Sequence, residues 1–132
     1  MIKKYLALDY GDSRIGVALG DDQVKIAVPM DAITVDGSEI DQITKLTRYE
    51  TVEAIVVGYP RNQSGEATKQ TAVVEGFADR LRKEFPAVVF QDESVTSVLA
   101  EARLKSYGKP YTKGDIDSMS AVIILEDFLE HR

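Results

Sequence analysis

The apolar and polar positions of the chain predict three strands first, and strands alternating with helices afterwards. Three short runs rich in apolar residues come first, at residues 5–10, 14–19 and 25–28. Turn-forming residues interrupt the pattern, with Gly11 after the first run and Pro29 after the third. Because such short connections join antiparallel neighbours, the pattern predicts an antiparallel meander of three strands.

A helix and a buried strand are predicted next. Ser38 is placed to cap the start of the helix. Apolar residues follow it at helical spacing, namely Ile40, Ile43 and Leu46. Residues 54–58 then form an unbroken apolar run, which is typical of a strand buried on both faces of a sheet. This strand opens the first of two strand–helix units.

The second helix is predicted between residues 67 and 85, where Pro86 stops it. Its apolar stripe consists of Val73, Val74, Phe77, Ala78 and Leu81. A short apolar run at residues 88–90 predicts the fifth strand.

Two helices complete the chain. Thr96 or Ser97 is placed to cap the third helix, which ends before Gly108. The residues expected to point inward from it are Val98, Leu99 and Ala102. The last helix runs from about Ile116 to the C-terminus.

The order of elements is therefore βββαβαβαα, which predicts an α/β fold. We expect a mixed five-stranded sheet, with an antiparallel meander of strands 1–3 followed by parallel strands 4 and 5. Helices should cover both faces of this sheet. The length of 132 residues, 44% of them apolar, favours a single domain spanning residues 1–132.

Acidic residues follow two of the predicted strands. Asp9 lies at the end of the first strand, and Asp92 and Glu93 come directly after the fifth. If these two strands are parallel, their carboxyl ends meet at one edge of the sheet. A third acid, Asp117, shares the inward stripe of the last helix. The other members of that stripe are Ala121, Ile124, Leu125 and Phe128.

Each acid alone has an ordinary structural explanation. For Asp117 a cap or a helix-dipole role is as good an interpretation as a site role, and for Asp92 a helix cap is favoured. Together, however, converging carboxylates repel one another unless they are protonated or bind a cation. With no cysteine and one histidine in the chain, all-oxygen ligation favours Mg²⁺ or Mn²⁺. Such cations activate water for attack on phosphodiesters.

Charge and the N-terminal pattern refine this hypothesis. The apolar stretch that follows the first lysines is broken at Asp9, too early for a signal peptide or a membrane span, so we expect a soluble cytoplasmic protein with no membrane partner. The net charge of −6 counts against a nucleic-acid partner. A basic patch remains possible where bases cluster around a single acid, Glu101. These bases are Arg103, Lys105, Lys109 and Lys113.

Four motifs carry a family resemblance. They are LALDYGDSRIGVAL at 6–19, IVVGYPRNQSGE at 55–66, DESVTS at 92–97 and DIDSMSAVIIL at 115–125. With them the chain resembles the YqgF family, a group of Holliday junction resolvase-like proteins and pre-16S rRNA nucleases within the ribonuclease-H-like superfamily. The four motifs span nearly the whole chain.

The resemblance implies roles for particular residues. Asp9, Glu93 and Asp117 match the catalytic and metal-binding acids of the family, and Asp92 is a further candidate ligand. This chain has Ser94 where the family motif commonly has Arg after the Asp-Glu pair. If that Arg helps to hold a phosphate in the family, its role here passes to another base or is weaker, and the candidates for nucleic-acid binding are Arg14, Arg61, Asn62 and Lys113. For Asn62 a simple turn, and for Lys113 a solvated charge, are the alternatives.

The function implied is a metal-dependent nuclease in ribosome biogenesis, acting in 5′-end processing of precursor 16S rRNA. Its partner would be structured RNA or branched DNA, and it would be a monomer or a homodimer. Holliday junction resolution is the alternative, and it would require two active sites and so a symmetric dimer.

Two further interpretations stay open. A binding module for RNA or a ribosome-assembly partner, without catalysis, would suit the acidity and Ser94, although the three acids argue against it. The hairpin at residues 8–17 is also similar to the phosphate-binding hairpin of actin-like ATPases, but those enzymes need two such domains and this chain has room for one.

Overall fold

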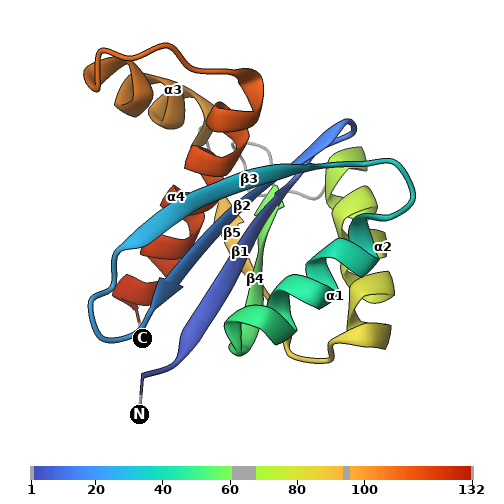
Figure 1. Cartoon of the computed structure of the whole chain (residues 1–132). Coiled ribbons are helices and arrows are strands. Elements are labelled where there is room, and N and C mark those ends of the chain that lie inside the picture. Colours follow the sequence, from blue (N-terminus) through green and yellow to red (C-terminus); the bar gives the residue numbers. More distant parts are fainter. Residues whose placement is uncertain (1, 61–67, 94–95, 132) are drawn as a thin grey trace.

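Five strands form one mixed sheet in the computed structural model, which describes residues 2–60, 68–93 and 96–131 (Figure 1). The strands are β1 Lys4–Tyr10, β2 Arg14–Asp21, β3 Ala27–Thr34, β4 Val52–Pro60 and β5 Val88–Glu93. Their order across the sheet is β3-β2-β1-β4-β5. β2 is antiparallel to β1 and β3, whereas β4 is parallel to β1 and β5. The predicted meander and the two parallel strands are confirmed.

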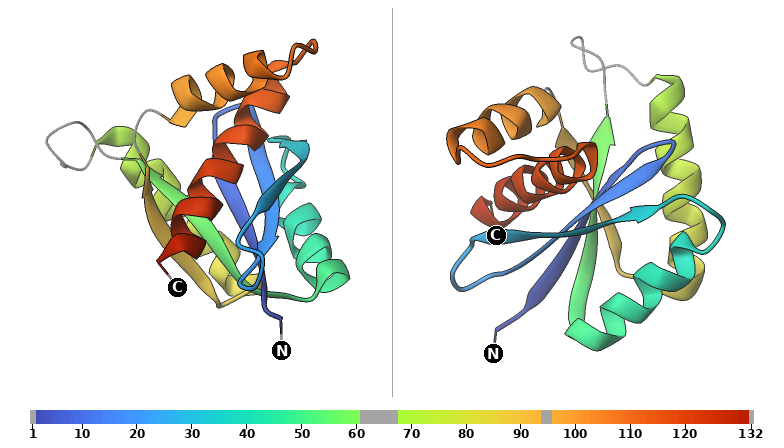
Figure 2. Two further views of the ribbon diagram at one scale, coloured as in Figure 1. Left: turned by 90° about the vertical axis from the view of Figure 1, so that its left-hand side faces the viewer. Right: turned by 45° about the horizontal axis from the view of Figure 1, so that its top comes forward.

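Four helices accompany the sheet within the same ranges. They are α1 Glu39–Glu50, α2 Lys69–Glu84, α3 Thr96–Ser106 and α4 Lys113–Glu130. α1 and α2 cover one face, α4 crosses the other, and α3 lies beyond the end of the sheet (Figures 1 and 2). The predicted order βββαβαβαα is confirmed. None of the helices described is long and apolar enough to cross a membrane.

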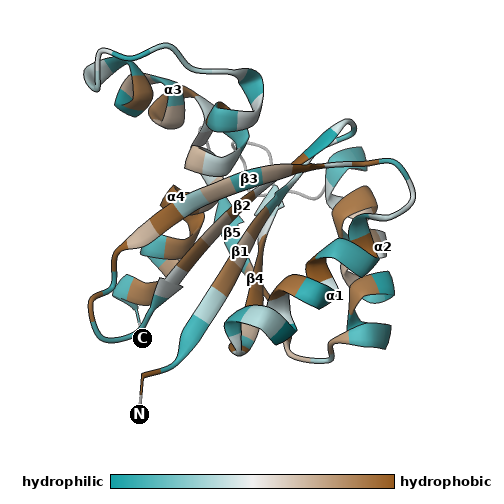
Figure 3. Cartoon of the chain, in the orientation of Figure 1, coloured by the Kyte–Doolittle hydropathy of each residue, from teal (hydrophilic) through white to brown (hydrophobic). Residues whose placement is uncertain are grey.

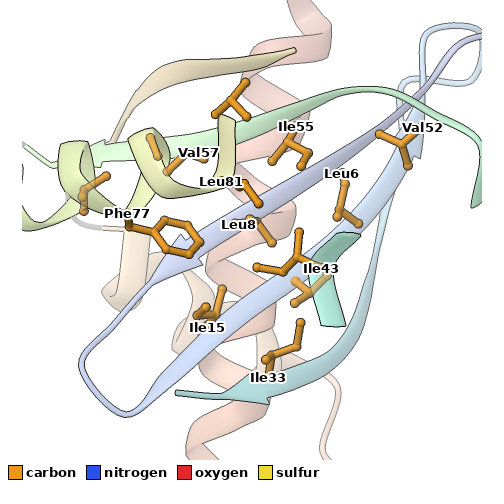
Figure 4. Packing of buried hydrophobic residues seen from close by; sticks show 14 residues of the cluster. Leu6, Leu8, Ile15, Ile33, Ile43, Val52, Ile55, Val57, Phe77 and Leu81 are labelled. Carbon is orange, nitrogen blue, oxygen red and sulfur yellow. The ribbon is translucent and has the colours of Figure 1, made fainter. Parts of the chain in front are cut away.

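Strand alternation divides the core into two layers. On one face, Leu6 and Leu8 of β1 pack with α1 and α2 side chains such as Ile43 and Phe77 (Figure 4). On the other face, side chains of β1, β2 and β4 pack against α4. Figure 3 shows apolar segments along the strands, and apolar and polar residues alternating along the helices. Burying one Leu or Ile side chain stabilises the folded state by about 1.5–3 kcal/mol. The two layers together therefore hold the strands, and the residues at their ends, in fixed positions.

The third strand is longer than the sequence predicts. The prediction that it stops at Pro29 is wrong, because β3 continues to Thr34 and Pro29 pairs with Ala18. β3 is an edge strand, where a residue without an N–H is tolerated because one side needs no partner. The pairing of β2 with β3 shifts register at a bulge between Ile15 and Val17.

The inward face predicted for the third helix is also wrong. Val98 and Leu99 are 70% and 52% exposed, and Ala102 is exposed. Ala100 is buried instead, and Leu104 packs beside it. The apolar residues of α3 are spread around the helix, so periodicity alone did not identify its inner side. In α2 the predicted stripe is buried apart from Val73, which is 44% exposed.

Candidate active site

Asp9 lies at the carboxyl end of β1, on the face covered by α4. It is paired with Gly16 of β2, and alternation along β1 places it with Tyr5 and Ala7, which belong to the α4 layer. Burial raises the pKa of Asp9 well above its usual value, and the neighbouring carboxylates of Glu93 and Asp117 raise this pKa further. Three acids from distant parts of the sequence therefore interact at one sheet edge.

Glu93 is the last residue of β5, so the strand extends three residues beyond the predicted run and includes both acids. A Cβ added to Gly58 of the neighbouring strand would lie 3.0 Å from the Glu93 Oε2 atom and 2.7 Å from Ile124 Cδ1. The absence of a side chain at Gly58 thus makes room for the Glu93 carboxylate beneath α4. Asp92 precedes Glu93 in the strand, and alternation directs it toward the opposite face.

Asp117 does not cap its helix. α4 begins three residues earlier than predicted, and its N-terminus is closed by Thr112 and Asp115. The Thr112 N–H donates to Asp115 Oδ2 over 2.8 Å, and the Asp115 N–H donates to Thr112 Oγ1 over 3.1 Å. With the cap supplied by Asp115, the Asp117 carboxylate is left to accept a hydrogen bond from Arg14 Nε at 2.8 Å.

Arg14 and Asp117 form an ion pair across the site. Their side chains are 39% and 26% exposed, so solvent screens the pair only in part. Arg14 is the first residue of β2, and Asp117 lies in the first two turns of α4. Among the described residues predicted to bind nucleic acid, Arg14 is the one that contacts an acid of the site, Asp117.

The first turns of α4 lie unusually close to β2. A Cβ on Gly16 would overlap the Asp117 carbonyl and lie 2.7 Å from the Ser118 nitrogen, so no other residue fits there without displacing the helix. The Ser118 hydroxyl accepts from the Val17 N–H at 3.1 Å and donates to the Met30 carbonyl at 2.7 Å. One hydroxyl therefore bridges β2 and β3 at the bulge and fixes the neighbouring Asp117.

Of the other residues predicted to bind nucleic acid, Lys113 belongs to the described part of the chain. Lys113 is the exposed first residue of α4. Arg61, Asn62 and Ser94 lie outside the described residues.

The donor set has the right chemistry for a hard divalent cation, since all three acids offer carboxylate oxygens. In their present positions, however, no three acidic or histidine side chains of the described ranges are grouped closely enough to hold a metal ion. Asp117 directs Oδ2 to Arg14 rather than to the other two acids. Binding a cation through all three residues would therefore require these side chains to move closer together.

Comparison with known proteins identifies the family. A family model described as RuvX: Holliday junction resolvase matches residues 3–131. The chain belongs to this RuvX family. A relative from Chloroflexus aurantiacus is 43% identical over 96% of this chain and 86% of its own length, and one from Shewanella oneidensis is 38% identical over 98% and 95%. Both relatives are named as candidate pre-16S rRNA nucleases.

Solved structures show the fold that this RuvX-family chain shares. Thermus thermophilus RuvC in complex with a Holliday junction superposes with a TM-score of 0.62 at 13% identity, covering 98% of this chain and 95% of that one. A second Thermus thermophilus RuvC structure gives a TM-score of 0.55 at 12% identity, with coverage of 100% and 96%. The predicted ribonuclease-H-like fold is confirmed.

Sequence reasoning missed three residues that shape this candidate site, namely Gly16, Gly58 and Ser118. A signal for the two glycines was present, because glycine within a strand often marks a close approach of another backbone or side chain. Nothing in the sequence indicated which atoms approach. Ser118 follows Asp117 directly, but a buried serine on an otherwise apolar helix face has no distinctive pattern.

Proposed function

We propose that this chain is a divalent-metal-dependent nuclease whose catalytic acids are Asp9, Glu93 and Asp117. The observation that carries the proposal is that the carboxylates of Glu93 and Asp117 act electrostatically on Asp9 where β1, β5 and α4 come together. Bringing mutually repelling carboxylates together around the poorly hydrated Asp9 is costly, and a purely structural site would lose stability by keeping them. A cation resolves the repulsion.

The three acids would hold Mg²⁺ or Mn²⁺ through carboxylate oxygens. Such a cation supplies charge stabilisation at a phosphate and a more acidic water. Arg14 would act as a positioning residue, because its bond to Asp117 Oδ2 orients that carboxylate. Asp92 is left out of the proposed ligand set, because alternation along β5 places it on the face of the sheet opposite to Glu93.

We propose precursor 16S rRNA as the substrate, with cleavage near the mature 5′ end during ribosome biogenesis in the cytoplasm. Support comes from the two relatives above, which are named for that RNA and align over almost the whole chain. A single domain is sufficient for trimming one strand.

Holliday junction resolution is the second candidate, favoured by the family description and by the fold shared with RuvC. Cutting two strands of a junction symmetrically would require a homodimer that places two sites in opposition. A monomer in solution that cuts RNA would argue against this candidate.

The test is a titration of Mn²⁺ or Mg²⁺ into the wild type, Asp117→Asn and Asp115→Asn. Heat of binding is followed by calorimetry, and cleavage is followed on a labelled precursor RNA and on a four-way junction. Asp115→Asn is the matched control, because it removes the same charge two residues away while Asn retains an acceptor for the cap.

We expect the wild type and Asp115→Asn to bind the cation and cut RNA, and Asp117→Asn to do neither. Cutting of the junction alone would replace the RNA proposal by the second candidate. If the wild type binds no cation and cuts neither substrate, the chain is a binding module.

A further inference from the structure

Residues 96–113, which we name the α3 arm, connect two of the proposed catalytic acids. The arm begins shortly after Glu93 and ends four residues before Asp117. It comprises α3 and the segment that leads into α4, and it projects beyond the end of the sheet in Figure 1 and in both views of Figure 2. A molecule whose reacting group enters the site from that end would pass beside the arm.

The arm carries positive charge on a chain that is acidic overall. Lys105, Lys109 and Lys113 are all exposed. Within the described ranges, none of the three forms an ion pair. The chain as a whole has a net charge of −6, so this group of free ammonium ions stands out from its surroundings.

The acids near the arm are bonded to other groups and form no ion pair with these lysines in the described ranges. Glu101 accepts a hydrogen bond from the Tyr111 hydroxyl at 2.8 Å. Glu126 of α4 pairs with Arg103 Nη1 at 3.0 Å. Asp115 accepts from a backbone N–H at the helix cap. The three lysines are therefore available to an external anion.

An exposed aromatic residue lies between two of the lysines in the sequence. Tyr107 is 54% exposed, immediately after α3 and between Lys105 and Lys109 in sequence. The pKa of Arg103 is raised mainly by Glu126 and in part by Tyr107, so the Tyr107 side chain lies near the Arg103 guanidinium. A half-exposed ring between two lysines in the sequence has the composition of a stacking platform for nucleic-acid bases.

We propose that the α3 arm binds an unpaired strand of RNA next to the cleavage site. Lys105, Lys109 and Lys113 contact successive phosphates, and Tyr107 stacks on one base. A base inside a duplex has no free face for this ring, so the arm selects single-stranded segments. The choice of RNA rests on the function proposed above; the binding mode rests on the charges and the exposed ring.

The first test measures binding without cleavage. Fluorescence anisotropy in EDTA compares a labelled single-stranded RNA dodecamer with the duplex of the same sequence, across a range of salt concentrations. The wild type should bind the single strand more tightly. In Lys105→Gln/Lys109→Gln the log–log slope of affinity against salt should fall by about 1.4, because each phosphate contact on a single strand contributes about 0.7.

The control is Lys45→Gln/Lys83→Gln, which removes the same charge from exposed positions of α1 and α2 on the other side of the sheet. Its salt slope should stay at the wild-type value. Equal losses in the two double variants would overturn the proposal, because they would show a general charge effect rather than binding by the arm.

The second test addresses stacking. Tyr107→Ala should weaken single-strand binding by about 5- to 100-fold with little change in salt slope, and Tyr107→Phe should retain binding. Unchanged affinity in Tyr107→Ala, or equal binding of duplex and single strand, would overturn the proposal. Both binding tests are made without metal and so do not depend on cleavage. If the protein binds RNA in this way but never cuts it, the proposed nuclease function is wrong and the proposed RNA binding by the α3 arm stands.

Discussion

Replacing Gly16 by alanine should displace the beginning of α4 and with it Asp117. The added Cβ would overlap the Asp117 carbonyl and lie 2.7 Å from the Ser118 nitrogen, where ordinary contacts begin at 3.4 Å. Both obstacles are backbone atoms, which cannot rotate away as a side chain would. The helix must therefore withdraw from β2 by roughly 1 Å to relieve the overlap.

Two costs follow from this movement. Overpacking of a tight contact costs about 1–3 kcal/mol. A shift of this size also breaks the hydrogen bond from the Val17 N–H to the Ser118 hydroxyl, now 3.1 Å, and leaves a buried donor unpaired for about 1–3 kcal/mol more. We expect a total loss of about 2–6 kcal/mol, or a fall in melting temperature of roughly 6–30 °C for a chain of this size.

Cleavage should suffer separately from stability. A catalytic group misplaced by about 1 Å commonly costs two orders of magnitude in rate. The assay is RNA cleavage with Mn²⁺ at a temperature well below the melting point of Gly16→Ala, alongside thermal unfolding followed by circular dichroism. Folded Gly16→Ala should cut roughly 100-fold more slowly than the wild type.

Gly76→Ala is the matched control for this experiment. It makes the same chemical change in the exposed part of α2, where an added Cβ meets nothing within 4 Å. Because alanine favours helix over glycine by about 1 kcal/mol, this variant should melt slightly higher and cut normally. If Gly16→Ala melts and cuts like the wild type, the close approach of α4 does not position Asp117.

Three further outcomes are expected. Asp9→Asn should abolish cleavage yet raise the free energy of unfolding near pH 7 in EDTA, because a raised pKa means that the ionised carboxyl destabilises the fold. This gain in stability should vanish as the pH falls toward the ordinary pKa value of 3.8. A variant less stable than the wild type at neutral pH would contradict the prediction. Gly58→Ala should weaken cation binding measured by calorimetry, since the new methyl group crowds the Glu93 carboxylate at 3.0 Å, and unchanged binding would show that this space is dispensable. The pKa of Glu39 is lowered by hydrogen bonds from its own backbone N–H and from the turn before α1. Its contribution to stability is therefore present above the ordinary value of 4.5 and is lost as the pH falls through the lower folded value. In urea denaturation, the free energy of unfolding of Glu39→Gln should be lower than that of the wild type at neutral pH, and the two should converge in acid.

The sequence alone determined the order of the elements, the mixed sheet and the identity of the three interacting acids. Each of these depends on local information. Apolar periodicity within ten or so residues distinguishes strand from helix, and the carboxyl ends of parallel strands meet at one edge whatever packs around them. Asp9 and Glu93 therefore could be placed together before any coordinates were known.

Some local patterns were not sufficient even for local structure. Pro29 ends most strands, but β3 lies at the sheet edge, and only the strand order shows that its missing N–H needs no partner there. The inner side of α3 likewise depends on where α4 lies, because the apolar residues of α3 follow no single stripe. Here the position of a neighbouring element decided the outcome.

Only the tertiary structure decided how the acids are held. Arg14 and Asp117 are 103 residues apart in sequence, and Val17 and Ser118 are 101 apart. Whether such pairs meet depends on the separation of helix and sheet to within about 1 Å, which is set by all the side chains packed between them. Periodicity predicts which face of α4 turns inward. It does not predict that Gly16 of β2 lets the α4 backbone approach the strand at Asp117.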